Sequence, residues 1–185
     1  MNLANCLTLL RVILAPVFFA VYFLPITDAR LAVALLWIIF VISEITDMFD
    51  GMAARKLNQS SDFGRLFDPF ADTLMQLSCF LCFVIDGIFP AFLFLIVLYR
   101  EFGILFIRNL MLRKGISMGA RISGKIKTVS YITAAAAALL YSSLCRLGTT
   151  ELQPVFAAAV LVIFCVSVLL AVISFFDYLS VYRRA

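Results

Sequence analysis

The amino-acid sequence predicts an all-α integral membrane protein of six transmembrane helices with an amino-terminal interfacial helix. Of its 185 residues, 64% are hydrophobic and 14% are charged, and the mean hydropathy is +1.09. A chain this apolar would not stay soluble as a monomer. Crossing about 30 Å of hydrocarbon takes about 20 apolar residues in a helix. Six runs approach that length, at 5–25, 31–54, 66–86, 89–112, 126–145 and 154–179.

The first run continues from a short interfacial helix, which we expect over residues 1–10 and which leads into the first span. It does not resemble a secretory signal, because no lysine-rich stretch precedes it and Arg11 lies within it. The second and third runs are joined by the short polar stretch 56–65, so we expect them to be antiparallel neighbours. Pro69 is expected at the start of the third helix, where its missing N–H is tolerated.

The fourth run carries Arg100, Glu101 and Arg108, and the fifth contains the alanine-rich segment 134–138. Small residues allow close helix packing in membranes, although alanine also has high helix propensity. No long polar linker or internal repeat divides the chain, so we expect a single domain over residues 1–185. The five cysteines lie mostly in apolar runs and indicate small core residues rather than disulfides. There is no histidine, so any acid–base chemistry falls to carboxylates, tyrosine or lysine.

Basic residues gather at alternate connections, which predicts the orientation of the chain. Three groups stand out: Arg55, Lys56 and Arg65; Arg113, Lys114, Arg121, Lys125 and Lys127; and Arg183 and Arg184. The opposite connections hold only Arg30 and Arg146. By the positive-inside rule, both termini lie in the cytoplasm. The net charge of +4 suits an anionic membrane surface or simply reflects this topology, and we expect no nucleic-acid partner.

Four aspartates lie inside the second and third runs, at Asp47, Asp50, Asp68 and Asp72. An aspartate at mid-bilayer costs about 2.5 to 3.5 kcal/mol, so four exposed to lipid would cost roughly 10 to 14 kcal/mol. At helical spacing, each pair shares one face of its helix, and the two faces can converge. Converging carboxylates cannot all ionise without cations between them, and hard divalent ions such as Mg²⁺ or Mn²⁺ meet that need. The other reading is a helix end solvated by headgroups and water.

Small and basic residues accompany the acids. Gly51 and Ala54, on or beside the acidic face, would let a bulky ligand approach the backbone. Arg55 supplies a cation for phosphate, and Gly64 allows a tight entry into the third helix. Ordinary packing would explain either glycine alone, but their register with the acids favours a site.

The pattern Asp47-x2-Asp50-Gly51-x2-Ala54-Arg55-x8-Gly64-x3-Asp68-x3-Asp72 resembles the signature of the CDP-alcohol phosphatidyltransferase family at every fixed position. The bacterial branch that makes phosphatidylglycerophosphate is similar in further motifs: Asn5-x2-Thr8-x2-Arg11, Arg100-Glu101 with Arg108, and Gly124-Lys125-x-Lys127-Thr128. Two positions depart from that branch. Thr73 replaces a usual lysine, and Glu44 stands where a small or polar residue is more usual.

The resemblance implies six transmembrane helices, a homodimer, and an active site on the cytoplasmic side of the bacterial cytoplasmic membrane. It implies a CDP-diacylglycerol donor and glycerol 3-phosphate as acceptor, in phospholipid biosynthesis. Metals, expected to be two Mg²⁺ or Mn²⁺ ions, would be held by Asp47, Asp50, Asp68 and Asp72, with Asp72 as the general base. The donor nucleotide would be bound by Gly51, Ala54, Arg55 and Gly64.

The acceptor phosphate would need cations, for which Arg108, Arg121, Lys125 and Lys127 are candidates, although each could instead be a topology determinant. Asn5, Thr8 and Arg100 are further possible site residues. We expect Glu101 to pair with Arg108 or Arg121, and Asp177 and Arg183 to anchor the last helix.

Two alternatives remain from the sequence. The acceptor could be inositol phosphate or an uncharged alcohol, and a neutral acceptor would leave the basic residues without a ligand. From another class, the chain could be a divalent-cation transporter, which would explain the acids but not Arg55, Gly64 or their spacing.

Overall fold

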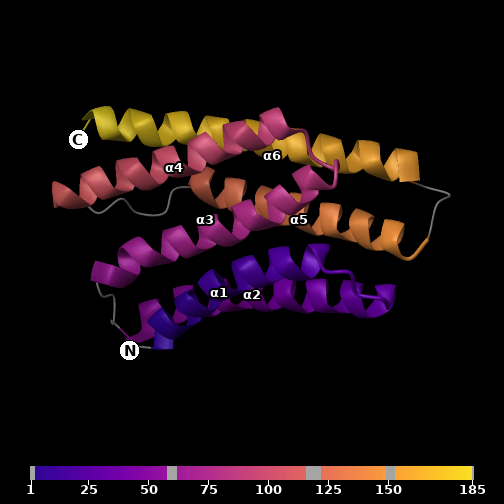
Figure 1. Ribbon diagram of the computed structural model, residues 1–185. Coiled ribbons are helices and arrows are strands. Elements are labelled where there is room, and N and C mark those ends of the chain that lie inside the picture. Colours follow the sequence, from indigo (N-terminus) through magenta and orange to yellow (C-terminus); the bar gives the residue numbers. More distant parts are fainter. Residues whose placement is uncertain (1–2, 58–61, 116–121, 149–152, 185) are drawn as a thin grey trace. The chain divides into compact units, whose positions relative to one another are not determined.

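The computed structural model describes residues 3–57, 62–115, 122–148 and 153–184, and their side chains within 6–47, 67–115, 122–148 and 154–183. These residues form helices joined by short connections, with no strand among them. The helices are α1 (Leu3–Phe23), α2 (Ala29–Leu57), α3 (Asp62–Ile85), α4 (Ala91–Arg113), α5 (Ile122–Arg146) and α6 (Gln153–Arg184). The all-helical fold predicted from the sequence is therefore confirmed (Figure 1).

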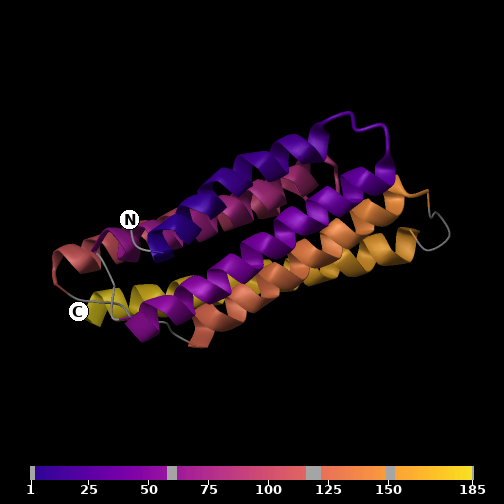
Figure 2. The same cartoon turned by 90° about the horizontal axis from the view of Figure 1, so that it is seen from below.

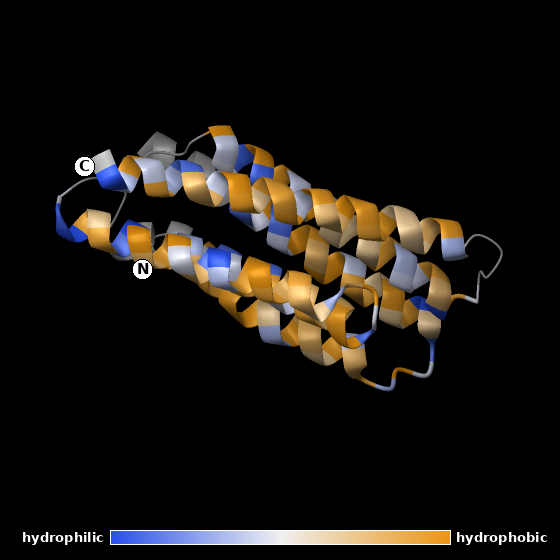
Figure 3. Ribbon diagram, turned by 90° about the horizontal axis from the view of Figure 1, so that it is seen from above, coloured by the Kyte–Doolittle hydropathy of each residue, from blue (hydrophilic) through white to orange (hydrophobic). Residues whose placement is uncertain are grey.

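Five helices in the described part of the chain are long and apolar enough to cross a membrane: α1, α2, α3, α5 and α6. Figure 3 shows the hydrophobic residues that predominate along them. The predicted sixth span corresponds to α4, which is a helix but does not belong to this group. It carries Arg100, Glu101, Arg108 and Arg113 in its sequence. The protein is thus an integral membrane protein with one helix whose charges must be satisfied inside the fold.

Two expectations about helix ends are wrong. The amino-terminal interfacial helix is not a separate element, because α1 continues unbroken from Leu3 to Phe23. Pro69 does not lie at a helix start, because α3 already begins at Asp62 and places Pro69 in its interior. The polar residues at 62–65 continue the helix instead of forming a loop. Prolines within membrane helices are tolerated where neighbouring groups satisfy the freed carbonyl.

The chain divides into two compact units, Met1–Cys82 and Phe83–Ala185. We describe each by itself and call them the amino-terminal and the carboxy-terminal unit; the single domain stays a prediction. In the amino-terminal unit, α1 and α2 pack side by side as a hairpin (Figure 1). Asp28 caps α2, since its Oδ1 accepts a hydrogen bond of 2.9 Å from the N–H of Arg30. Phe18, Tyr22 and Leu36 are buried in this unit.

In the carboxy-terminal unit, α6 packs along both α4 and α5. Figure 2 shows α5 and α6 running side by side. Ala134, Ala135 and Ala138 are fully buried on α5, in agreement with close packing at the alanine-rich segment. Phe89 and Phe164 stack with their ring centroids 3.7 Å apart. At Gly103 of α4, a Cβ would lie 2.9 Å from the ring of Phe175, so a larger residue would require this ring of α6 to shift.

Candidate functional site

The acidic residues of the amino-terminal unit meet polar side chains from α1. Thr8 and Arg11, three residues apart, share one face of α1, and Asp68 and Asp72, four apart, share one face of α3. The Thr8 hydroxyl donates a hydrogen bond to Asp68 Oδ1, and Arg11 Nη1 donates to Asp72 Oδ1. The polar face of α1 therefore matches the acidic face of α3 position by position.

Arg11 also joins α3 to α2. Its Nη1 lies 2.7 Å from Asp47 Oδ1, so a single nitrogen is shared by the carboxylates of Asp47 and Asp72. The Arg11 side chain is only 2% exposed, whereas those of Asp47 and Asp72 are 45% and 47% exposed. A buried guanidinium is tolerated only when its charge is paired, and here the pairing comes from two acids that face a more open side.

Three of the four signature aspartates are thus placed near one another. Asp50, Gly51, Ala54 and Arg55 belong to the last turns of α2, and Gly64 lies in the first turn of α3. The side chains of these residues and of Asn5 lie outside the described side chains, and Arg121 lies outside the described residues.

Arg11 is the residue that the sequence reasoning missed as part of the site. It entered only as a motif position. A stronger signal was available, because a charge inside an apolar run generally marks function.

The described donor set suits a divalent cation, although the described side chains contain no group of three or more acids or cysteines placed to hold a metal ion. Carboxylate oxygens are the ligands that Mg²⁺ prefers. The guanidinium of Arg11 places a positive charge at the point where Asp47 and Asp72 converge, as a bound metal ion would. These residues therefore fit a metal site by their chemistry.

The two departures from the branch pattern lie close to this cluster. Glu44 is half-buried one turn before Asp47 on α2, and Thr73 is buried directly after Asp72 on α3. Thr73 is only 8% exposed and, unlike a lysine, carries no positive charge beside the acids.

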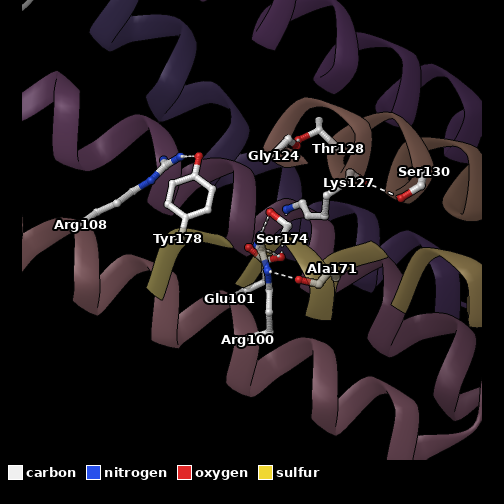
Figure 4. A network of polar contacts seen from close by, with 10 residues as sticks. All are labelled: Arg100, Glu101, Arg108, Gly124, Lys127, Thr128, Ser130, Ala171, Ser174 and Tyr178. Atoms are coloured by element: carbon white, nitrogen blue, oxygen red, sulfur yellow. Dashed lines mark hydrogen bonds and ion pairs between the residues drawn. The ribbon is translucent and has the colours of Figure 1, made fainter. Parts of the chain in front are cut away.

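The carboxy-terminal unit contains a buried network of charges (Figure 4). Glu101 Oε1 lies 2.7 Å from Arg100 Nη1 and 2.9 Å from Lys127 Nζ. Arg100 also donates to the Ala171 carbonyl at 3.2 Å and to Ser174 Oγ at 3.1 Å. Glu101 was expected to pair with Arg108 or Arg121. Its described ion pairs are instead with Arg100 and Lys127, and Arg121 lies outside the described residues. The network connects α4 to α5 and α6. It also compensates the charges of Arg100 and Glu101, which are among the charged residues that distinguish α4 from the five apolar helices.

Arg108 is anchored separately, by Tyr178 of α6. Its Nη2 donates to the Tyr178 hydroxyl at 3.3 Å, and its guanidinium lies 5.6 Å from the ring centroid (Figure 4). A Cβ at Gly124 would lie 3.0 Å from the same hydroxyl, which explains the glycine of the Gly124-Lys125-x-Lys127 motif. Nearby, Ser123 donates to Asp177 Oδ2 at 2.6 Å, so Asp177 joins α5 to α6.

Lys125 and Lys127 of the Gly124-Lys125-x-Lys127 motif point to different sides of α5. Two residues apart on a helix, they are separated by about 200°. Lys127 turns to Glu101, whereas Lys125 lines an apolar groove of about 540 Å³ between α5 and α6, together with Val129 and Val162. The structure thus brings Lys127 into the buried network and places Lys125 outside it.

Comparison with known proteins identifies the family. A model of the CDP-alcohol phosphatidyltransferase family matches residues 1–173. A CDP-diacylglycerol–glycerol-3-phosphate 3-phosphatidyltransferase of Treponema pallidum is 37% identical, over 98% of this chain and 89% of its own length. A protein of the same name from Bacillus subtilis is 35% identical, over 76% of this chain and 78% of its own. A probable phosphatidylglycerophosphate synthase of Mycobacterium tuberculosis is 34% identical, over 97% and 80%. With the acidic signature on α2 and α3, these matches show that the chain belongs to the CDP-alcohol phosphatidyltransferase family.

Proposed function

We propose that this protein transfers the phosphatidyl group of CDP-diacylglycerol to glycerol 3-phosphate, which yields phosphatidylglycerophosphate and CMP. The observation that carries the proposal is the convergence of Asp47 and Asp72 on one cationic point, with Asp68 beside them, in a family whose relatives bear this activity in their names. Acids at the ends of two membrane helices suit phosphoryl transfer, in which positioning and charge stabilisation dominate.

The aspartates would hold the metal and move the proton. Asp47, Asp50, Asp68 and Asp72 are the ligands proposed for divalent ions, Mg²⁺ or Mn²⁺, which when bound neutralise charge on the phosphates. Asp72 would accept the proton of the acceptor hydroxyl as its oxygen attacks the phosphorus that carries diacylglycerol. The bond from that phosphorus to the CMP oxygen then breaks. A carboxylate that is half exposed, as Asp72 is, remains accessible to such a substrate.

Different residues would bind the nucleotide of the donor and the phosphate of the acceptor. Gly51, Ala54, Arg55 and Gly64 are proposed for the nucleotide. Asn5 and Thr8 are further possible site residues, and Thr8 contacts Asp68 of the acidic cluster. Arg108 and Lys127 are the leading candidates for the acceptor phosphate, because each is held in place by a defined partner, Tyr178 or Glu101. Lys125 and Arg121 remain candidates on sequence grounds, whereas Arg100 serves mainly to tie α4 to α6.

The relation to the membrane completes the proposal. We propose that both termini and the active site lie on the cytoplasmic side of the bacterial cytoplasmic membrane, which the alternating basic connections support. CDP-diacylglycerol would reach the site from the surrounding lipid, and glycerol 3-phosphate from the cytoplasm. A homodimer is part of the proposal through the family resemblance.

A panel of alcohols tests the reaction. Purified protein in detergent receives CDP-diacylglycerol, Mg²⁺ and one acceptor at a time, and CMP release is followed. We expect CMP only with glycerol 3-phosphate, with EDTA abolishing it. If CMP is released only with inositol phosphate or only with a neutral alcohol, glycerol 3-phosphate is not the acceptor. If no alcohol causes CMP release, the protein is not a transferase of this kind. The Asp72→Asn variant serves as the control for contaminating activity.

A further inference from the structure

Arg11 holds a position that the proposed reaction does not yet use. It lies in the apolar segment Cys6–Phe23 of α1, and the whole residue is 1% exposed. A buried cation in an apolar helix is unfavourable unless its charge is compensated. The described contacts pair its charge with Asp47 and Asp72, two residues of the signature.

The contacts show that Arg11 competes for the atoms that a metal ion would need. Asp47 and Asp72 each direct Oδ1 to the same nitrogen, Nη1. These contacts use lone pairs of the two oxygens and put a positive charge directly beside them, so Arg11 and a divalent ion oppose each other at the same carboxylates. One turn earlier on α1, the Thr8 hydroxyl donates a hydrogen bond to Asp68 Oδ1. The face of α1 thus supplies hydrogen-bond donors to three acids proposed as ligands.

We propose that Arg11 is an internal counter-cation of the acidic site, which holds Asp47 and Asp72 together in the metal-free protein and gives up their oxygens when a divalent ion binds. The inference rests on the metal site of the proposed function. Its physical basis is repulsion, because converging carboxylates need a positive charge between them. Arg11 provides that charge before the metal arrives, and the same charge then repels the incoming ion. The same side chain therefore stabilises the metal-free fold and weakens the binding of metal.

Metal binding and thermal unfolding test both halves of the inference. Full-length protein in detergent is stripped with EDTA and titrated with Mn²⁺, with free Mn²⁺ followed by electron paramagnetic resonance. For Arg11→Met we expect the Kd for Mn²⁺ to fall on the order of tenfold, after allowance for screening at half-exposed acids. Without metal, the same variant should melt at a lower temperature than wild type, and Mn²⁺ should raise its Tm by more.

Two further variants sharpen the comparison. Arg11→Lys keeps a charge but loses the fork-shaped guanidinium, so its Mn²⁺ affinity should lie between those of wild type and Arg11→Met. It also decides the question if Arg11→Met does not fold. Arg30→Met is the matched control, because Arg30 is an exposed arginine at the start of α2, and it should change neither the Kd nor the Tm.

The outcomes separate the inference from the proposed function. If Arg11 has only a structural role, its variants melt earlier but bind Mn²⁺ equally or more weakly, and the competition is refuted. If wild type binds no Mn²⁺, the metal site of the proposed function is refuted and the inference with it. Tighter binding in Arg11→Met together with a lower metal-free Tm supports both.

Discussion

Glu101→Gln should strongly destabilise the carboxy-terminal unit, because Glu101 is the acid of a buried network that also contains two cations. The side chains of Arg100 and Glu101 are each 6% exposed, and that of Lys127 is 13% exposed. The substitution keeps the size of the side chain but leaves both cations uncompensated. Removing one partner of a buried ion pair costs about 3 to 5 kcal/mol.

The contacts place this substitution toward the lower end of that range. Arg100 keeps its bonds to the Ala171 carbonyl and Ser174 Oγ, and Lys127 keeps the ring of Tyr131 at 4.4 Å from its Nζ. We therefore expect a loss of about 3 kcal/mol, which corresponds to a fall in Tm of roughly 6 to 12 °C for a chain of this size. Thermal unfolding in detergent, followed by intrinsic fluorescence, measures it.

A double-mutant cycle tests the cause. Adding Lys127→Met to Glu101→Gln removes one of the stranded cations, so the pair of substitutions should cost less than the sum of the single ones. Asp177→Asn is the matched control, since Asp177 is a partly exposed acid of the same unit, and its loss should be about 1 kcal/mol or less. A Glu101→Gln protein as stable as the Asp177→Asn protein, or a strictly additive cycle, would show that the network does not stabilise the fold.

Further predictions concern the two sites. Asp72→Asn should leave the protein folded, because Arg11 keeps its ion pair with Asp47, but lower CMP release by about 10²- to 10⁴-fold, as expected for loss of a general base; near-normal turnover would rule out that role. Arg108→Gln should raise the KM for glycerol 3-phosphate at least tenfold, which corresponds to about 1.4 kcal/mol, with little change in the KM for CDP-diacylglycerol; a uniform change in both would argue against a phosphate contact. Gly124→Leu should destabilise the protein by about 1 to 3 kcal/mol, because its side chain meets the Tyr178 hydroxyl, whereas the same change at exposed Gly115 would show strain alone.

Local features of the fold could be predicted because the membrane restricts the choices. Backbone polar groups must be satisfied within a spanning segment, so each apolar run predicts a helix. The fourth run became α4 at nearly the expected residues, although its charges separate it from the apolar helices. Helix ends were less predictable. At Asp62 a polar stretch that suggested a loop instead continues α3, and at Leu3 one long helix replaces two.

The acidic face could also be predicted, because helical spacing alone indicates that Asp68 and Asp72 lie on one face of their helix and that Asp47 can face them. The partners of these acids could not. Arg11 lies 36 residues from Asp47 and 61 from Asp72 in the chain, and no local pattern indicates which acid a distant arginine will meet. Similarly, Lys127 and Lys125 look equivalent in sequence, and only the packing of α5 against its neighbours turns one to Glu101 and the other to a groove.

By itself, the sequence determined the class of protein, the helical spans and the acidic signature, because hydropathy and helical period are properties of neighbouring residues. The tertiary structure alone decided how the charges are paired. Pairing depends on which helix faces meet, and this is a consequence of side-chain packing between segments far apart in the chain. In this protein it places a buried arginine of α1 between two aspartates of the signature, and it makes Glu101 the centre of a separate network on α4.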